Sequence, residues 1–131
     1  MRDHTKLRAF ELADEVAILT YQITRTFPRE EVYGLTSQMR RAAVSAASNI
    51  VEGCARESGS EYLRFLTMAF GSLRELHYQV GLSNRLGYLS TEQNTICINK
   101  IDEAERVLGA LIRSIRPKVR GDQAKPLLPT A

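Results

Sequence analysis

Residues 58–80 read SGSEYLRFLTMAFGSLRELHYQV, and this stretch decides the fold class. Its apolar residues recur at alternating steps of four and three, which forms a seam of the kind that packs in left-handed helical bundles. The members of this seam are Tyr62, Leu66, Ala69, Leu73, Leu76 and Val80. Ser58 and Glu61 have capping-box spacing, so a long helix is predicted to begin here and to end near Gly87.

Three further segments carry the same helical period. They cover residues 7–27, 35–53 and 90–116, and their expected ends are Pro28, Gly53 and Pro117. The seam of the last segment consists of Cys97, Ile101, Ala104, Leu108, Leu111 and Ile115. No sustained alternation of period two predicts a strand. Four amphipathic helices with short connections predict an all-α, antiparallel up-down-up-down four-helix bundle over residues 1–116.

The composition changes after the last predicted helix. Residues 117–131 hold three of the four prolines, so we expect a disordered, basic, proline-containing tail. No run of apolar residues is long enough for a membrane span, and the first residues lack the apolar block of a secretory signal. A cytoplasmic protein that does not bind a membrane is the expectation. Cys54 and Cys97 are accordingly expected to be reduced thiols.

Enzyme signatures are missing from the sequence. A di-iron bundle needs Glu-x-x-His on two helices, and the chain contains no such motif. It also has no phosphate-binding loop, Cys-x-x-Cys pair or nucleophile elbow. His77 is interpreted as a structural histidine. The sequence therefore predicts no catalytic residue, metal or cofactor.

A polar stripe runs along the second predicted helix, on a face separate from its small apolar residues. Its members are Gln38, Arg41, Ser45, Asn49 and Glu52. A polar line at helical spacing is typical of a solvated face. Only two of the five residues are charged, however, so the alternative is a hydrogen-bonded contact between helices or between subunits.

Basic residues gather near the end of the last helix, although the net charge of the chain is only +3. Between Glu105 and Asp122 the sequence has five cations and no acid: Arg106, Arg113, Arg116, Lys118 and Arg120. At a helix end, Arg113 and Arg116 would complement the macrodipole, whereas Lys118 and Arg120 lie beyond the predicted end. Arg113, Arg116, Lys118 and Arg120 are the candidate nucleic-acid-binding residues. This region has no aromatic residue, so stacking is not expected to contribute.

The stretch from Phe27 to Gly53 resembles one family. It contains Phe27-Pro28, Glu31-x-Tyr33-Gly34-Leu35-Thr36-x-Gln38-x-Arg40-Arg41-Ala42-Ala43-Val44-Ser45 and Asn49-Ile50-x-Glu52-Gly53, and further matches follow at Tyr62-Leu63-x-Phe65-Leu66, Ala69-x-Gly71-Ser72-x-x-Glu75-Leu76 and Leu86-Gly87-Tyr88. The chain is similar here to the four-helix-bundle proteins encoded in intervening sequences of 23S ribosomal RNA genes. Distant relatives are accessory proteins of diversity-generating retroelements, which bind a reverse transcriptase and nucleic acid.

The resemblance implies a homopentameric ring with no known catalytic activity. It carries over no established functional residue, and we interpret the matching polar positions as structural or interface groups: Glu31, Gln38, Arg41, Ser45, Asn49, Glu52 and Glu75. Two functions remain open. The first is a non-enzymatic oligomeric scaffold that binds RNA, DNA or a nucleic-acid enzyme; the alternative is a protein–protein interaction module with no nucleic-acid role. Salt dependence separates them, because phosphate contacts weaken steeply as salt rises.

Overall fold

The computed structural model describes residues 2–124 and consists of four long helices. These are α1 (Arg8–Thr24), α2 (Leu35–Ala55), α3 (Gly59–Arg85) and α4 (Thr91–Ala124), with short 3-10 helices η1 (His4–Lys6) and η2 (Arg29–Glu31) before α1 and α2. Ser58 caps α3 as predicted, since its side chain accepts a hydrogen bond from the Glu61 N–H. Gly87 follows α3 with a φ of 82°. The predicted all-α fold with four helices is confirmed.

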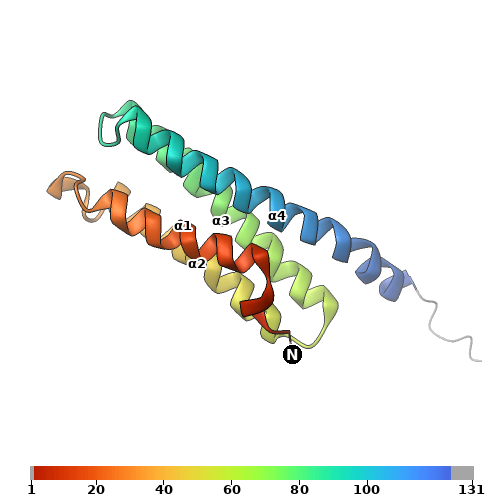
Figure 1. The fold of residues 1–131 in the computed structure, drawn as a ribbon. Coiled ribbons are helices and arrows are strands. Elements are labelled where there is room, and N and C mark those ends of the chain that lie inside the picture. The colour runs from red at the N-terminus through yellow and green to blue at the C-terminus, as the bar shows by residue number, and fades with distance from the viewer. Residues whose placement is uncertain (1, 125–131) are drawn as a thin grey trace, which may run out of the picture.

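Neighbouring helices run in opposite directions (Figure 1). Between α3 and α4, Arg74 pairs with Glu105 and His77 pairs with Asp102, so the residue numbers rise on one helix as they fall on the other. The same opposite order relates α2 to α3, where Arg41 contacts Glu75. This fixed register decides which side chains of α3 lie beside the cations of α4.

The core lies along the predicted seams. Leu73 and Leu76 of α3 and Leu108 of α4 are fully buried in one cluster with residues of α1 and α2, while Leu111 packs against the same cluster and is partly buried. In the middle of α2 the core-facing residues are small: Ala42, Ala43 and Ala46 are all fully buried. Small side chains let the neighbouring helices approach closely, and a bulkier residue there would overpack the core.

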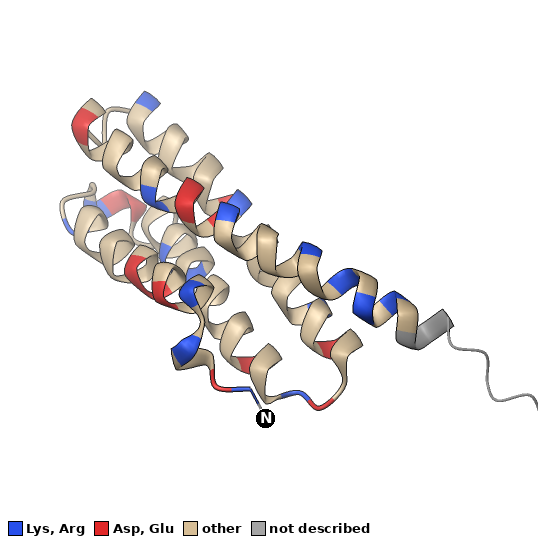
Figure 2. Ribbon diagram, turned by 45° about the vertical axis from the view of Figure 1, so that its right-hand side comes forward, with Lys and Arg blue, Asp and Glu red and all other residues tan. Residues whose placement is uncertain are grey.

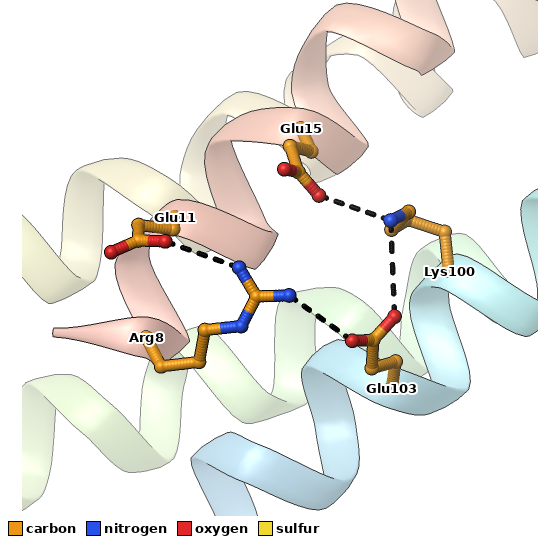
Figure 3. Close-up of polar contacts among 5 residues, drawn as sticks. All are labelled: Arg8, Glu11, Glu15, Lys100 and Glu103. Carbon is orange, nitrogen blue, oxygen red and sulfur yellow. Dashed lines mark hydrogen bonds and ion pairs between the residues drawn. The ribbon is translucent and has the colours of Figure 1, made fainter.

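Ion pairs join the first helix to the last (Figure 3). Arg8 contacts Glu11 on its own helix and Glu103 on α4, with N–O distances of 3.1 and 3.2 Å. Lys100 of α4 lies 3.0 Å from Glu15 of α1. These side chains are all partly exposed, and ion pairs at such positions contribute little to stability. They fix the relative position of α1 and α4 more than they stabilise the fold.

Helix α4 is longer than the sequence predicted. Pro117 lies inside it, and the helix continues to Ala124, so the expected end at Pro117 is wrong and a tail cannot begin there. Proline deprives the Arg113 carbonyl of its usual N–H donor, which costs about 3 kcal/mol in a helix interior. Burial of Val119, which is 7% exposed and lies beside Gly59 at the start of α3, offsets part of this cost. Residues 125–131 of the predicted tail lie outside the described residues.

Both cysteines are free and buried. Burial raises the pKa of the Cys97 thiol to about 11, and it raises the pKa of Cys54 as well. Thiols with raised pKa values are poor nucleophiles at neutral pH. None of the described helices is both long enough and apolar enough to cross a membrane.

Candidate nucleic-acid interface

The cations of α4 lie on the part of the helix that runs toward its C-terminal end (Figure 2). Arg113, Lys118 and Arg120 are exposed and Arg116 is half-buried. Across residues 2–121, whose side chains are described, neither these four nor Arg106 has an acidic partner within ion-pair distance. Carboxylates of residues 2–121 therefore do not neutralise the positive charge of this half-helix.

The helix macrodipole does not explain these cations. Because α4 ends at Ala124, Arg113 and Arg116 lie eleven and eight residues before its end, and the last turn contains no basic residue. The dipole acts on charges within about one turn of the terminus. The structural explanation that the sequence offered for Arg113 and Arg116 is therefore wrong, and their charge has no role in stabilising the helix end.

A cleft of about 480 Å³ separates α3 from α4 beside these cations. Arg106, Arg113 and Arg116 line it from α4, and Phe70 and Ile112 supply its apolar surface. A second hollow of about 460 Å³ continues toward the end of α4, and Arg120 joins Arg116 there. Three of the four predicted residues thus share the α3–α4 groove. Lys118 does not, because it lines a different hollow, beside Arg2 and Leu7.

The acidic residues that line the cleft, Asp102 and Glu105, lie at the end away from Arg113 and Arg116. Glu105 accepts a hydrogen bond from Arg74 at 3.0 Å, and Asp102 lies 3.3 Å from the His77 ring nitrogen. In the second hollow, Arg64 contacts Glu61 at 2.7 Å, and this contact lowers the pKa of the Glu61 carboxyl. Glu105 and Glu61 are thus already paired with arginines of α3, and Asp102 contacts His77 of the same helix. Among residues 2–121, no acid of the groove is in ion-pair contact with the α4 cations.

Sequence reasoning missed Phe70, the aromatic residue of this cleft. It lies on α3, far from the α4 cations in the sequence, and only the antiparallel register brings it opposite Gly109. One signal was present in the sequence, because two apolar seams joined by a short connection predict an antiparallel pair of helices. In such a pair the residue numbers of neighbours have a constant sum. Arg74 and Glu105 are neighbours here, and their sum of 179 also places Phe70 opposite Gly109.

The polar stripe of α2 finds its partners inside the chain. Arg41 donates to Gln38 and to Glu75 of α3, with nitrogen–oxygen distances of 3.0 and 2.8 Å. The hydroxyls of Ser45 and Ser72 are 2.9 Å apart, and Asn49 donates to the Ser45 carbonyl. Two members of the stripe, Arg41 and Ser45, thus contact α3, whereas Gln38 and Asn49 bond to residues of α2 itself. Glu52 is exposed and makes no hydrogen bond with a described residue.

Glu31 holds two loops together at one end of the bundle. Its carboxylate accepts hydrogen bonds from the Leu35 N–H, the first residue of α2, and from the Tyr88 hydroxyl in the α3–α4 connection. A Cβ on Gly34 would lie 2.5 Å from the Glu31 carboxylate oxygen, so an alanine there would displace this carboxylate. The hydrogen bond to Glu31 raises the pKa of Tyr88. Glu31 has a structural role, as a cap for α2.

A second surface carries exposed apolar side chains among polar ones. Ile18, Tyr21, Val32 and Val44 are each exposed by more than two fifths, and the last three line one hollow between α1 and the start of α2. A neighbouring hollow along the same two helices shares Val44 and includes Phe10. Contiguous exposed apolar side chains are typical of protein interaction sites.

These features define an all-α four-helix bundle. Its α3–α4 groove is lined by cations that have no ion-pair partner among residues 2–121. The chain belongs to the 23S rRNA-intervening sequence protein family, whose model matches residues 5–110. A solved structure from Bacteroides thetaiotaomicron, described as a protein of unknown function from the S23 ribosomal protein family, is 21% identical; the match covers 79% of this chain and 97% of that chain, with a TM-score of 0.72. At this identity the likeness shows the fold alone. No curated protein matches the chain.

Proposed function

We propose that the protein is a non-enzymatic, homo-oligomeric scaffold in the cytoplasm that binds nucleic acid electrostatically through the cations of α4. The observation that carries this proposal is the set of five cations between residues 106 and 120 that have no acidic partner among the described side chains. The helix dipole does not account for Arg113 and Arg116, and ion pairs among residues 2–121 account for none of the five. Arg113, Arg116 and Arg120 share one groove, which a phosphate backbone can follow.

Assembly would multiply this charge. The family resemblance implies a pentamer, in which five subunits with five of these cations each would carry about twenty-five cations. Such an assembly would bind one polyanion through several weak contacts. Because Arg41 and Ser45 of the α2 stripe bond to α3 of the same chain, the stripe no longer supports a subunit interface. Support for self-association comes instead from the exposed apolar surface of Ile18, Tyr21, Val32 and Val44.

The test of nucleic-acid binding compares two variants of equal net charge. The first replaces Arg113, Arg116, Lys118 and Arg120 with glutamine. The matched control replaces Lys6, Arg25, Arg29 and Arg85, which are also exposed cations without an ion pair among the described residues. Both variants change the formal charge from +3 to −1. Fluorescence anisotropy with a labelled RNA at two salt concentrations gives the affinity and its salt slope.

We expect the first variant to lose affinity and to lower the salt slope by about one unit for each phosphate contact removed. The control should retain most of the wild-type slope. Equal losses in the two variants would show that only net charge matters, and unchanged binding in the first would place the site elsewhere. Mass measurement in solution tests the assembly, and a monomer at micromolar concentration would refute it.

A protein–protein interaction module is the second candidate, and the apolar surface between α1 and α2 favours it. Such a docking surface would bind its partner with little dependence on salt. Absence of RNA or DNA binding by the wild-type protein at low salt, together with retained assembly, would support this function over the first.

A further inference from the structure

Phe70 places an aromatic ring among the unpaired cations of α4. It is partly buried, it packs against the core on one side, and it lines the α3–α4 cleft together with Arg106 and Arg113. A Cβ on Gly109, directly opposite, would lie 3.5 Å from the ring carbon Cε2. The ring edge therefore faces a residue of α4 that has no side chain, with the Arg113 guanidinium close by.

Gly109 lies buried in the wall of this cleft, beside Phe70 and Arg113. It lies in the middle of α4, where glycine is less favourable than alanine. An alanine methyl group would contact Phe70 and would lie 3.3 Å from the Arg113 guanidinium nitrogen. The backbone itself does not need glycine, because its φ is not positive. The missing side chain lets the Phe70 ring and the Arg113 guanidinium lie close to the backbone of α4.

An aromatic side chain beside a line of cations has the chemistry of a single-strand binding groove, in which a base stacks on the ring and phosphates contact the cations. Bases of a duplex are stacked on each other and do not present a free face to such a ring. The cleft volume of about 480 Å³ lies in the range of sites that hold one small ligand. We infer that the α3–α4 cleft binds single-stranded nucleic acid, with an unpaired base against Phe70 and the backbone on Arg113 and Arg116.

This inference rests on the proposed function and adds a dependence on the bases. If phosphates alone are bound, a strand without bases binds as well as a normal strand of the same length. If one base stacks on Phe70, the normal strand binds about five- to 100-fold more tightly at equal salt. The probes are a single strand of mixed sequence of about 16 nucleotides, an abasic strand of equal length, and the corresponding duplex.

The chain contains no tryptophan, so the fluorescence of a single introduced tryptophan reports on stacking at its own position. Phe70→Trp places one indole in the cleft, and we expect the mixed-sequence strand to quench it while the abasic strand does not. Tyr78→Trp is the matched control on the same helix, since Tyr78 is 61% exposed and does not line the cleft. Quenching of the Tyr78 variant to the same degree, or no quenching of the Phe70 variant, would overturn the inference.

Affinity measurements test the same contact without a new fluorophore. Phe70→Leu keeps an apolar side chain against the core, and it should remove the preference for the normal strand over the abasic strand while the salt slope stays unchanged. Gly109→Ala should also weaken this preference although it leaves the helix at least as stable. Gly71→Ala is its control, because a Cβ there meets no atom within 4 Å. Thermal midpoints confirm that each variant is folded.

The outcomes separate the two proposals. Equal binding of the mixed-sequence and abasic strands by the wild-type protein, with a steep salt slope, would refute the stacking contact and leave electrostatic binding intact. Failure of the wild-type protein to bind any strand at low salt would refute both. Tighter binding of the duplex than of the single strand would also refute a cleft that takes an unpaired base.

Discussion

Leu108→Ala tests the packing of the bundle at its centre. Leu108 is 0% exposed and lies mid-way along α4, in the same core as Leu73 and Leu76. Removal of three side-chain carbons from such a site leaves a cavity, and the expected cost is about 2 to 5 kcal/mol. Leu111→Ala is the matched control, because Leu111 is one turn further along the same helix and only partly buried. Its cost should be about half as large.

Urea denaturation followed by circular dichroism measures both variants. All proteins are compared at one concentration, since self-association makes stability depend on concentration. We expect unchanged m-values and a lower midpoint for Leu108→Ala. At about 4 °C per kcal/mol, a loss of about 3 kcal/mol lowers the melting temperature by roughly 12 °C. A Leu108→Ala variant as stable as wild type, or a larger loss for Leu111→Ala, would refute the seam.

Three further predictions concern single residues. Burial raises the pKa of the Cys97 thiol from 9.0 to about 11, so the unfolded chain loses this proton at a lower pH than the folded protein does. The free energy of unfolding should therefore fall as the pH rises from about 9 to about 11. The urea midpoint of Cys97→Ala should fall less over this range. Pro117→Ala restores a donor to the Arg113 carbonyl and should raise the free energy of unfolding by about 1 to 3 kcal/mol, also measured in urea. Gly34→Ala should displace Glu31 from its capping position and cost about 1 kcal/mol, with no additional loss in a variant that also carries Glu31→Ala.

The sequence predicted the helices and the core well, because both follow from the periodicity of apolar residues. Leu66, Leu73, Leu76 and Leu108, chosen from their spacing alone, are all fully buried. The end of α4 was predicted wrongly. Proline usually ends a helix, and the prediction used this tendency alone. Val119 is buried beside α3, and this tertiary contact, which helps α4 to continue past Pro117, cannot be inferred from the local sequence.

The candidate site was predicted in part. Spacing grouped Arg113, Arg116 and Arg120, which do share a groove, but it could not show that Lys118 faces another hollow. Whether a polar stripe contacts solvent, another helix or another subunit depends on what lies opposite, and periodicity carries no information about that. Phe70 was missed for the same reason.

The ion pairs between α1 and α4 have a consequence for the order of folding. Arg8 and Glu103 are 95 positions apart in the sequence, and Glu15 and Lys100 are 85 apart, whereas the other neighbouring helices are joined by short connections. Closing so long a loop is entropically costly and is not repaid until most of the chain is in place. We therefore expect α1 and α4 to meet late, after the hairpins have formed. Changes in salt that weaken these pairs then act mainly on the rate of unfolding and leave the rate of folding almost unchanged.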